Sequence, residues 1–213
     1  MRKSRRGWLV TFAGGLALVV SSPRTTPAQE TPPADVDTKI RTSIETMVKS
    51  IEDGNTPMRD RMFFELRIVG NASVPALVEL MKDSRVKVRE YAIHTVSYID
   101  DERWIDPVLA ILRSDPEAST RAMACRALAR TQDTPVLTEA GRKAIPVLLE
   151  KLQKDEETVA MDAAFALGWF GDPVARAALQ EAAKSSSELV SFFAKEALEN
   201  IAHAEKMKQK KGN

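Results

Sequence analysis

The chain has 213 residues, 44% of them hydrophobic and 29% charged, and its 31 basic and 30 acidic side chains give a formal charge of +1. This balance gives no support to nucleic-acid binding, and the single cysteine, Cys125, excludes an internal disulfide. The two histidines, His94 and His203, lie far apart and no cysteine cluster accompanies them, so we expect neither a metal site nor a cofactor.

The first 28 residues have the three-part plan of a secretory signal peptide. Four basic residues precede an apolar run over residues 8–20, and the small residues Thr26 and Ala28 follow it two positions apart. The run of 13 residues is shorter than the ~20 that a membrane-spanning helix needs. We therefore expect a signal peptide over residues 1–28 with cleavage after Ala28, and an uncleaved anchor is the alternative.

The export route has two candidates. Arg5 and Arg6, followed by Trp8, resemble the twin-arginine signal that carries folded proteins, whereas ordinary Sec export accepts any basic pair. Either route predicts a periplasmic or extracellular protein that meets the membrane only through its signal. Loss of residues 1–28 removes five basic side chains, which leaves 26 basic against 30 acidic residues and a formal charge of −4. The mature chain is therefore mildly acidic.

Three further segments follow the signal. Residues 29–36 are polar and rich in proline, which predicts a short disordered leader. Residues 37–204 carry helical patterning and are long enough for one elongated domain. Residues 205–213 form a lysine-rich C-terminal tail, which is typical of a solvated helix end.

The helical region is built from repeats. Four stretches share an apolar helix, a polar turn and an alanine-rich second helix: 73–100, 104–133, 144–172 and 173–202. Their second helices align at steps of 32, 39 and 31 residues, and an insertion over about 133–142 explains the long step. A fainter copy begins near residue 37. Because one helix pair cannot bury its own apolar face, the repeats predict an all-α fold, a right-handed α-solenoid of about five stacked antiparallel helix pairs.

The repeat motifs carry a family resemblance. VPALVELMKD with VREYAIHTV, and IPVLLEKLQKD with MDAAFALGWFGD, resemble HEAT repeats in the short bacterial version called the phycobilisome-lyase type. The resemblance implies a polar ladder between repeats, built on a second-helix arginine that is present at Arg59, Arg89 and Arg121 and replaced at Ala160 and Ser191. We therefore expect the ladder to break in the C-terminal half. The motif identifies a fold and leaves function open.

The sequence predicts no catalytic residue. Cys125 lies in the alanine-rich stripe with no histidine or acid near it, so we expect a buried, inert thiol rather than a nucleophile.

Function is predicted to lie in a surface instead. The second helices of such stacks line the concave side, and the candidate partner-binding side chains there are Glu90, His94, Arg126, Phe165, Trp169 and Glu196. Aromatic side chains beside arginine make good anchors for a protein partner. The alternative is that Phe165 and Trp169 fill the core and that His94 is an ordinary surface residue.

Three hypotheses of function follow. The leading one is a non-enzymatic, exported scaffold that binds a protein or peptide on its concave face. The second is a lyase-like or enzyme-accessory subunit that holds a small molecule in the groove. The third is a structural spacer of the cell envelope.

Overall fold

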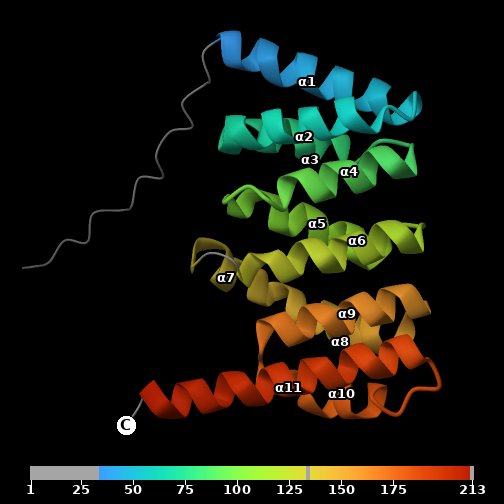
Figure 1. Cartoon of the computed structure of the whole chain (residues 1–213), viewed down its shortest axis with the longest axis vertical. Helices are drawn as coiled ribbons and strands as arrows, with labels where there is room; N and C mark the ends of the chain where they lie inside the picture. The colour runs from blue at the N-terminus through green and yellow to red at the C-terminus, as the bar shows by residue number, and fades with distance from the viewer. Residues whose placement is uncertain (1–33, 133–134, 212–213) are drawn as a thin grey trace, which may run out of the picture. The chain divides into compact units, whose positions relative to one another are not determined.

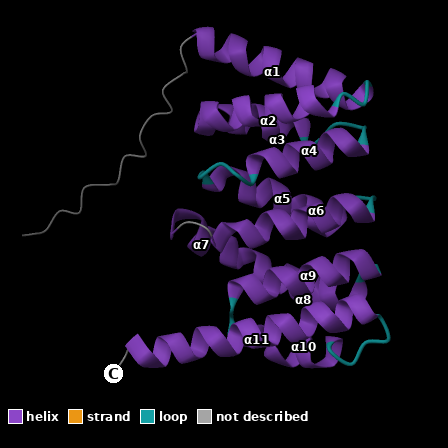
Figure 2. Ribbon diagram, in the orientation of Figure 1, coloured by secondary structure: helices purple, strands orange, loops and turns teal. Residues whose placement is uncertain are grey.

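The computed structural model describes residues 34–132 and 135–211, and every secondary-structure element within these ranges is a helix (Figure 2). The all-α prediction is therefore confirmed for the described part of the chain. The expected signal peptide, residues 1–28, and the leader up to residue 33 lie outside the described residues. None of the described helices is long and apolar enough to cross a lipid bilayer.

Five helix pairs follow one another along the described chain, and each pair packs on the next (Figure 1). The first helices of the pairs are α1 (Ala34–Glu52), α3 (Val74–Leu80), α5 (Ile105–Ser114), α8 (Ile145–Lys154) and α10 (Arg176–Ala182). The second helices are α2 (Thr56–Val69), α4 (Val86–Val96), α6 (Ala118–Ala129), α9 (Glu157–Phe170) and α11 (Glu188–Lys211). The arrangement confirms an α-solenoid with the number of pairs that the repeats predicted.

Single turns of 3-10 helix join the pairs. They are η1 (Gly70–Ser73), η2 (Glu102–Trp104), η3 (Arg130–Gln132), η4 (Arg142–Ala144) and η5 (Pro173–Ala175). Two of them begin at an aspartate whose side chain accepts a backbone N–H group, since Asp101 accepts from Arg103 and Asp172 accepts from Val174. Each carboxylate satisfies a donor that the start of a helix leaves without a partner. The entry into α5 and α10 is therefore fixed by local sequence.

The expected insertion contains a helix of its own, α7 (Pro135–Gly141), which the repeat pattern did not predict. Gly141 ends this helix at a point where a Cβ atom would lie 2.1 Å from Oγ1 of Thr131. A side chain there would clash, so glycine allows the insertion to close tightly onto η3.

A stripe of small side chains lets neighbouring second helices approach one another. Ala92, Ala124, Ala163 and Ala194 occupy equivalent positions in four repeats, and all four are fully buried. The larger aliphatic residues four positions on lie on the same face of each helix and fill the space beside the stripe. Three of these residues are also fully buried: Val96, Leu128 and Leu167. The apolar spacing of the sequence thus marks the seam between repeats.

The seam between α9 and α11 is especially tight. A Cβ atom built on Gly168 would lie 2.8 Å from Cα of Ala197 and 2.9 Å from its Cβ. Gly171 then ends α9 in the left-handed conformation, with φ of 58°, which glycine adopts at little cost. These two glycines allow α9 to pack closely on the last helix and to stop after Phe170.

Two arginines form the polar ladder that the family resemblance implied. Arg89 donates from Nε and Nη2 to the Asp115 carboxylate over 2.9 and 3.0 Å. Arg121 donates in the same way to Asp155 over 3.0 and 2.6 Å. Each arginine also donates to carbonyl oxygens in the turn of its own repeat. The two pairs therefore tie the turn of one repeat to the turn of the next.

The repeats before and after these two arginine–aspartate pairs do not continue the ladder. Arg59 does not reach the next turn; it bonds Asp60 instead and lies 4.3 Å from the ring centroid of Tyr91. Ala160 and Ser191 take the arginine position in the last two repeats, as the sequence indicated. The arginine at position 59 is therefore directed to the surface of the second helices rather than to the turns.

The helical region extends beyond its expected limits at both ends. α1 begins at Ala34 rather than at residue 37, and Asp35 and Asp37 in its first turn suit the positive end of the helix dipole. α11 runs on to Lys211, so most of the tail expected over 205–213 continues the last helix.

Candidate functional site

Among the described residues, two hollows open on the surface formed by α2, α4, α6, α9 and α11, here the second-helix face, and the second hollow also includes residues from the end of α1 and the turn after it. The first hollow, the central pocket, has a volume of about 430 Å³ and is lined by His94, Ser97, Tyr98, Met123, Arg126, Ala127, Ala129, Arg130, Phe165 and Trp169. The second, the N-terminal pocket, has a volume of about 480 Å³ and is lined by Ser50, Ile51, Gly54, Arg59, Lys87, Glu90, Tyr91, His94 and Met123. His94 and Met123 line both pockets, so the two hollows adjoin.

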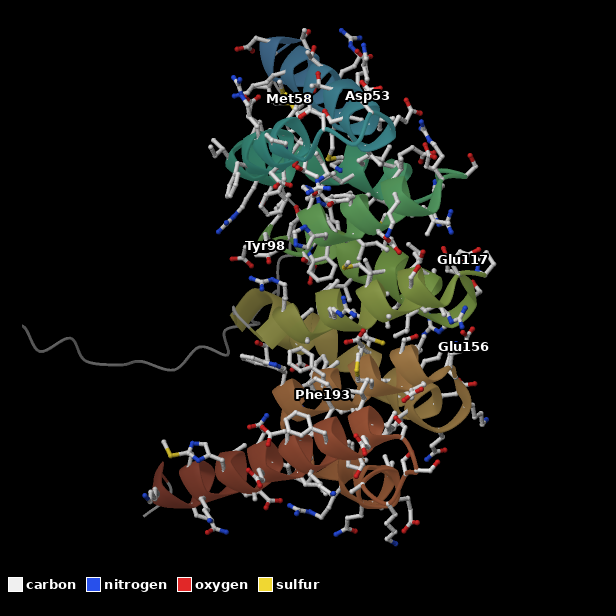
Figure 3. All side chains as sticks on the ribbon, turned by 45° about the vertical axis from the view of Figure 1, so that its right-hand side comes forward. Asp53, Met58, Tyr98, Glu117, Glu156 and Phe193 are labelled. Carbon is white, nitrogen blue, oxygen red and sulfur yellow. The ribbon has the colours of Figure 1, made fainter. Side chains whose placement is uncertain are left out.

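Figure 3 helps to place this face. Tyr98, from the second repeat, lies above Phe193, from the last, along the stack. Glu117 and Glu156, at the turns before α6 and α9, lie at the right-hand edge. The turns that carry the arginine ladder are therefore separate from the hollowed part of the face.

Four rings form the α4 cluster between the two pockets: Phe63, Tyr91, His94 and Tyr98. The His94 ring stacks on Phe63 with centroids 5.1 Å apart and meets Tyr98 edge-on, also at 5.1 Å. Tyr98 in turn lies under two guanidinium groups, at 3.7 Å from Arg130 and 5.3 Å from Arg67. Cations over aromatic faces are attracted by the ring quadrupole, so this cluster gathers positive charge on the second-helix face.

His94 stays neutral at pH 7 in this setting. Burial lowers the pKa of its imidazole, and the charges of Arg130 and Arg59 lower it further against the opposing effect of Asp60. Its Nδ1 atom is buried without a hydrogen-bond partner among the described residues. A neutral imidazole with a free nitrogen can donate to or accept from a bound group, depending on its tautomer.

A second group of rings, the α9 cluster, lies on the other side of the central pocket: Phe165, Trp169, Phe192 and Phe193. Phe165 meets Trp169 with centroids 6.1 Å apart and Phe193 at 6.0 Å, both edge-on. Trp169 is 51% exposed and Phe192 is 55% exposed. Side chains of this size exposed on a helix face are available to a partner.

Arg126 links the two sides of the central pocket. Its Nη2 atom lies 2.7 Å from Oδ2 of Asp162, whose side chain is 7% exposed, while the Arg126 side chain is 50% exposed. Burial raises the pKa of the Asp162 carboxyl, and the pairing with Arg126 opposes that effect. The Arg126 guanidinium is therefore held by a buried acid on α9, while half of the Arg126 side-chain surface stays open to solvent.

The structure brings five of the six predicted partner-binding residues together. Arg126, Phe165 and Trp169 line the central pocket, Glu90 lines the N-terminal pocket, and His94 lines both. Glu90 is 7% exposed and its Oε2 accepts from Nζ of Lys87 over 2.8 Å. The sixth residue, Glu196, is exposed on α11 and lines neither pocket.

The structure also bears on the alternative, in which Phe165 and Trp169 fill the core and His94 is an ordinary surface residue. Trp169 is half exposed and Phe165 is half-buried in a pocket wall, so neither is enclosed in the core. His94 packs among rings and is not an ordinary surface residue.

The candidate list left out six residues that line the central pocket, and the three with large side chains are Tyr98, Met123 and Arg130. Each stands three or four positions from a predicted residue on the same helical face, so extending the register by one turn would have found them. The contribution of Phe63 from the preceding repeat had no comparable signal.

The chemistry of the remaining candidates is limited. Cys125 is fully buried, and burial raises the pKa of its thiol well above the usual range. A thiol in that state is a poor nucleophile. Among residues 34–132 and 135–211, no group of three or more His, Cys, Asp or Glu side chains is placed to hold a metal ion.

Comparison with known proteins identifies the repeats. Residues 105–199 match the family model of HEAT repeats. This part of the chain is built from HEAT repeats. The matched part of the chain lies in the third, fourth and fifth helix pairs, and it includes Arg126, Phe165 and Trp169 of the central pocket. No curated protein matches the chain.

Solved structures of similar fold agree. The complex of CpcE and CpcF of phycocyanin lyase from Nostoc sp. PCC7120 matches with a TM-score of 0.65 and 22% identity, over 76% of this chain and 98% of that one. An engineered protein matches with a TM-score of 0.52 and 23% identity, over 67% and 68% of the two chains. A designed armadillo repeat protein in complex with the peptide (KR)4 matches with a TM-score of 0.50 and 19% identity, over 73% and 80%. At these identities the likeness establishes the fold.

Proposed function

We propose that this protein is an exported, non-enzymatic scaffold that binds a protein or peptide partner on its second-helix face. The observation that carries the proposal is the central pocket. There the half-exposed side chains of Trp169 and Arg126 lie beside the half-buried rings of His94 and Phe165. Tryptophan, tyrosine and arginine are the residues that dominate binding energy at protein interfaces.

The similar structures support a protein partner. One is a complex of two proteins, CpcE and CpcF, and another is a designed repeat protein that holds the peptide (KR)4. Those partners belong to those proteins. The physical feature shared with this chain is a stack of helices that offers one extended face, along which a partner can contact several repeats at once.

The absence of enzyme activity is part of the proposal and rests on chemistry. Cys125 is enclosed at the seam between repeats, and the histidine of the central pocket, His94, is held among rings with no carboxylate of the described residues hydrogen-bonded to its Nδ1 atom. Such a histidine lacks the orienting partner that general-base catalysis uses.

Export is proposed from the sequence of residues 1–28. The basic start, the apolar run over residues 8–20 and the small residues Thr26 and Ala28 have one shared explanation, which is a signal peptide removed by its peptidase. The partner would then be met outside the cytoplasm.

Site-specific photo-crosslinking tests the binding face. A photoreactive phenylalanine analogue is placed at Trp169 on the second-helix face, and in a matched variant at Arg113, which is exposed on the first helix α5. After irradiation in cells of the native host, we expect a discrete crosslinked protein from position 169 and none from position 113. Capture of the same protein from both positions, or from position 113 alone, would place the partner elsewhere. A product of twice the mass of the chain would favour the envelope spacer.

One observation favours the second candidate function, a subunit that holds a small molecule. The central pocket, at about 430 Å³, lies within the range of ~300–1,000 Å³ that small-molecule sites occupy. Native mass spectrometry of the protein purified from its host separates the two functions. A retained non-protein mass that disappears in a Trp169→Ala variant would support the small-molecule function over the scaffold.

A further inference from the structure

An exposed apolar row continues the α9 cluster onto the last helix. Phe192 meets Phe193 edge-on with ring centroids 5.3 Å apart, and Phe193 meets Phe165 in the same way at 6.0 Å, so the rings run from α11 to α9 without a break. Trp169 extends the row beyond Phe165, and Leu189 precedes Phe192 on α11 by three positions. The side chains at the two ends of the row are about half exposed. A continuous row of large apolar side chains open to solvent is a surface that a partner can cover.

A carboxylate stands in line with these rings. Glu196 is exposed and follows Phe192 by four positions and Phe193 by three, so it shares a face of α11 with both. Helical side chains lean toward the N-terminus of their helix, which directs this carboxylate toward the two rings. The other residues three and four positions away are Glu199 and Asn200. The helix itself therefore offers Glu196 no cation.

The neighbouring positive charges point elsewhere or are already paired. Lys195 is one position from Glu196, which places it about 100° around the helix. The facing helix α9 contains no lysine, arginine or histidine. Arg126, on the next helix of the stack, is paired with Asp162 over 2.7 Å. The α11 end of the second-helix face is therefore apolar and acidic.

Elsewhere on the same face, rings take up cations. Arg59 lies 4.3 Å from the ring centroid of Tyr91, and Arg67 lies 5.3 Å from that of Tyr98. No contact of this kind within residues 34–132 and 135–211 involves a ring of the α9 cluster. A cationic group from a partner can stack on an open ring there and pair with the Glu196 carboxylate at the same time, and the two attractions reinforce each other.

We infer that the α9 cluster and Glu196 take a peptide segment of a partner protein in which a basic side chain stands one or two positions from a large apolar one. The basic group stacks on Phe192 and pairs with the Glu196 carboxylate, and the apolar side chain packs on the rings of Phe165 and Trp169. Arginine suits the first position better than lysine, because its guanidinium is flat enough to stack on a ring while its N–H groups, which lie in the plane, bond a carboxylate. This inference rests on the proposed function and adds the chemistry of the partner.

Three peptides test this chemistry by isothermal titration calorimetry against the purified chain. The first is the capped peptide Gly-Arg-Leu-Arg-Leu-Gly, the second carries glutamate in place of each arginine, and the third carries alanine in place of each leucine. We expect the first to bind roughly tenfold or more tightly than either of the others, since a charge-assisted hydrogen bond and the burial of a leucine side chain each contribute about that much. Its affinity should fall as salt is raised.

Two variants and a matched control locate the peptide. Glu196→Gln should weaken the first peptide roughly tenfold and keep its advantage over the alanine peptide, because the charge is lost and the apolar contact is not. Trp169→Ala should weaken the first peptide and reduce that advantage. Glu150→Gln, which removes an exposed acid on the first helix α8, should change neither affinity. Thermal unfolding of each variant checks that the fold is kept.

The outcomes separate this inference from the proposed function. Equal or tighter binding of the glutamate peptide overturns the basic partner and leaves the scaffold standing, as does failure of all three peptides while crosslinking at position 169 succeeds. Failure of all three peptides together with failure of crosslinking removes both proposals. Binding of the first peptide that Glu150→Gln weakens as much as Glu196→Gln would show a diffuse attraction to an acidic chain and contradict the site on α11.

Discussion

Gly168→Ala tests the tight seam between α9 and α11, because two physical effects of opposite sign meet at this position. In an isolated helix, replacing glycine by alanine stabilises by about 0.5–1 kcal/mol, since alanine loses less backbone entropy on folding. In the folded chain the new methyl group would lie 2.8 Å from Cα of Ala197, which is backbone and cannot rotate away. One of the helices must therefore move.

The relative size of the two effects decides whether Gly168→Ala raises or lowers the free energy of unfolding. Extra methyl groups in a well-packed core cost about 1–3 kcal/mol, which exceeds the helix-propensity gain. We expect the free energy of unfolding to fall by about 1–2 kcal/mol, which for a domain of this size lowers the unfolding midpoint by roughly 2–8 °C. The shift should also reach the site, because Trp169 follows the substituted residue and Phe193 precedes Ala197 on the facing helix by one turn.

Differential scanning calorimetry and denaturant titration measure the change, and a double-mutant cycle gives the control. Ala197→Gly removes the Cβ atom at 2.9 Å and keeps the Cα atom at 2.8 Å, so the double variant should be less destabilised than the sum of the two single variants. A Gly168→Ala protein with a midpoint at or above that of the original chain would refute the close approach. If the changes in the free energy of unfolding of the two single variants simply add in the double variant, residues 168 and 197 are not in contact.

Three further predictions concern the core, the ladder and the N-terminus. Ala124→Leu or Ala163→Leu should destabilise by about 1–3 kcal/mol, because both alanines are fully buried at the seam between repeats; a denaturant midpoint unchanged by both would contradict that placement. The Asp155 carboxyl is subject to burial, which raises its pKa, but hydrogen bonds from Arg121, the backbone of Glu156 and Lys151 prevail and lower it to about 2 from 3.8. Its pairing therefore stabilises the fold above about pH 4, by about 2 kcal/mol, and this contribution is lost as the pH falls from about 4 to 2. Arg121→Gln should remove most of that acid-dependent loss in unfolding titrations, and an unchanged pH profile would disprove the ladder. Mass spectrometry of the mature protein should find Gln29 at its N-terminus, whereas intact residues 1–28 would mean that the chain stays tethered to the membrane. Replacing Arg5 and Arg6 by lysine should abolish export if the protein uses the twin-arginine route and leave export unchanged if it uses the Sec route.

The regular part of the fold could be predicted because it repeats. The alanine register at Ala92, Ala124 and Ala163 reports a close helix contact in each repeat, and several copies of one weak signal add to a strong one. The insertion had no copy to compare with, so its helix α7 was missed. The loss of the arginine–aspartate ladder at Ala160 could be predicted from the sequence alone, since an alanine side chain cannot form an ion pair with an aspartate of the next turn.

The candidate site was predicted in outline from the same register. His94, Arg126 and Phe165 stand at equivalent positions in successive repeats, and equivalent positions on parallel helices face the same way. That argument also selected Glu196, which lies outside both pockets. It could not show that Phe63 from the preceding repeat stacks on His94, because contacts between repeats depend on the angle at which helices cross.

The sequence by itself determined the helices of the repeats, the number of helix pairs, the residues of the seam and the side chains that face outward from the second helices. All of these follow from periodicity, which is a local property of a chain. The tertiary structure decided which outward side chains meet, how deep the hollow between α4, α6 and α9 is, and that Arg59 turns to Tyr91 instead of to the next turn. Those features depend on the rotation and spacing between successive helix pairs, set by the packing of whole faces, including the close approach at Gly168.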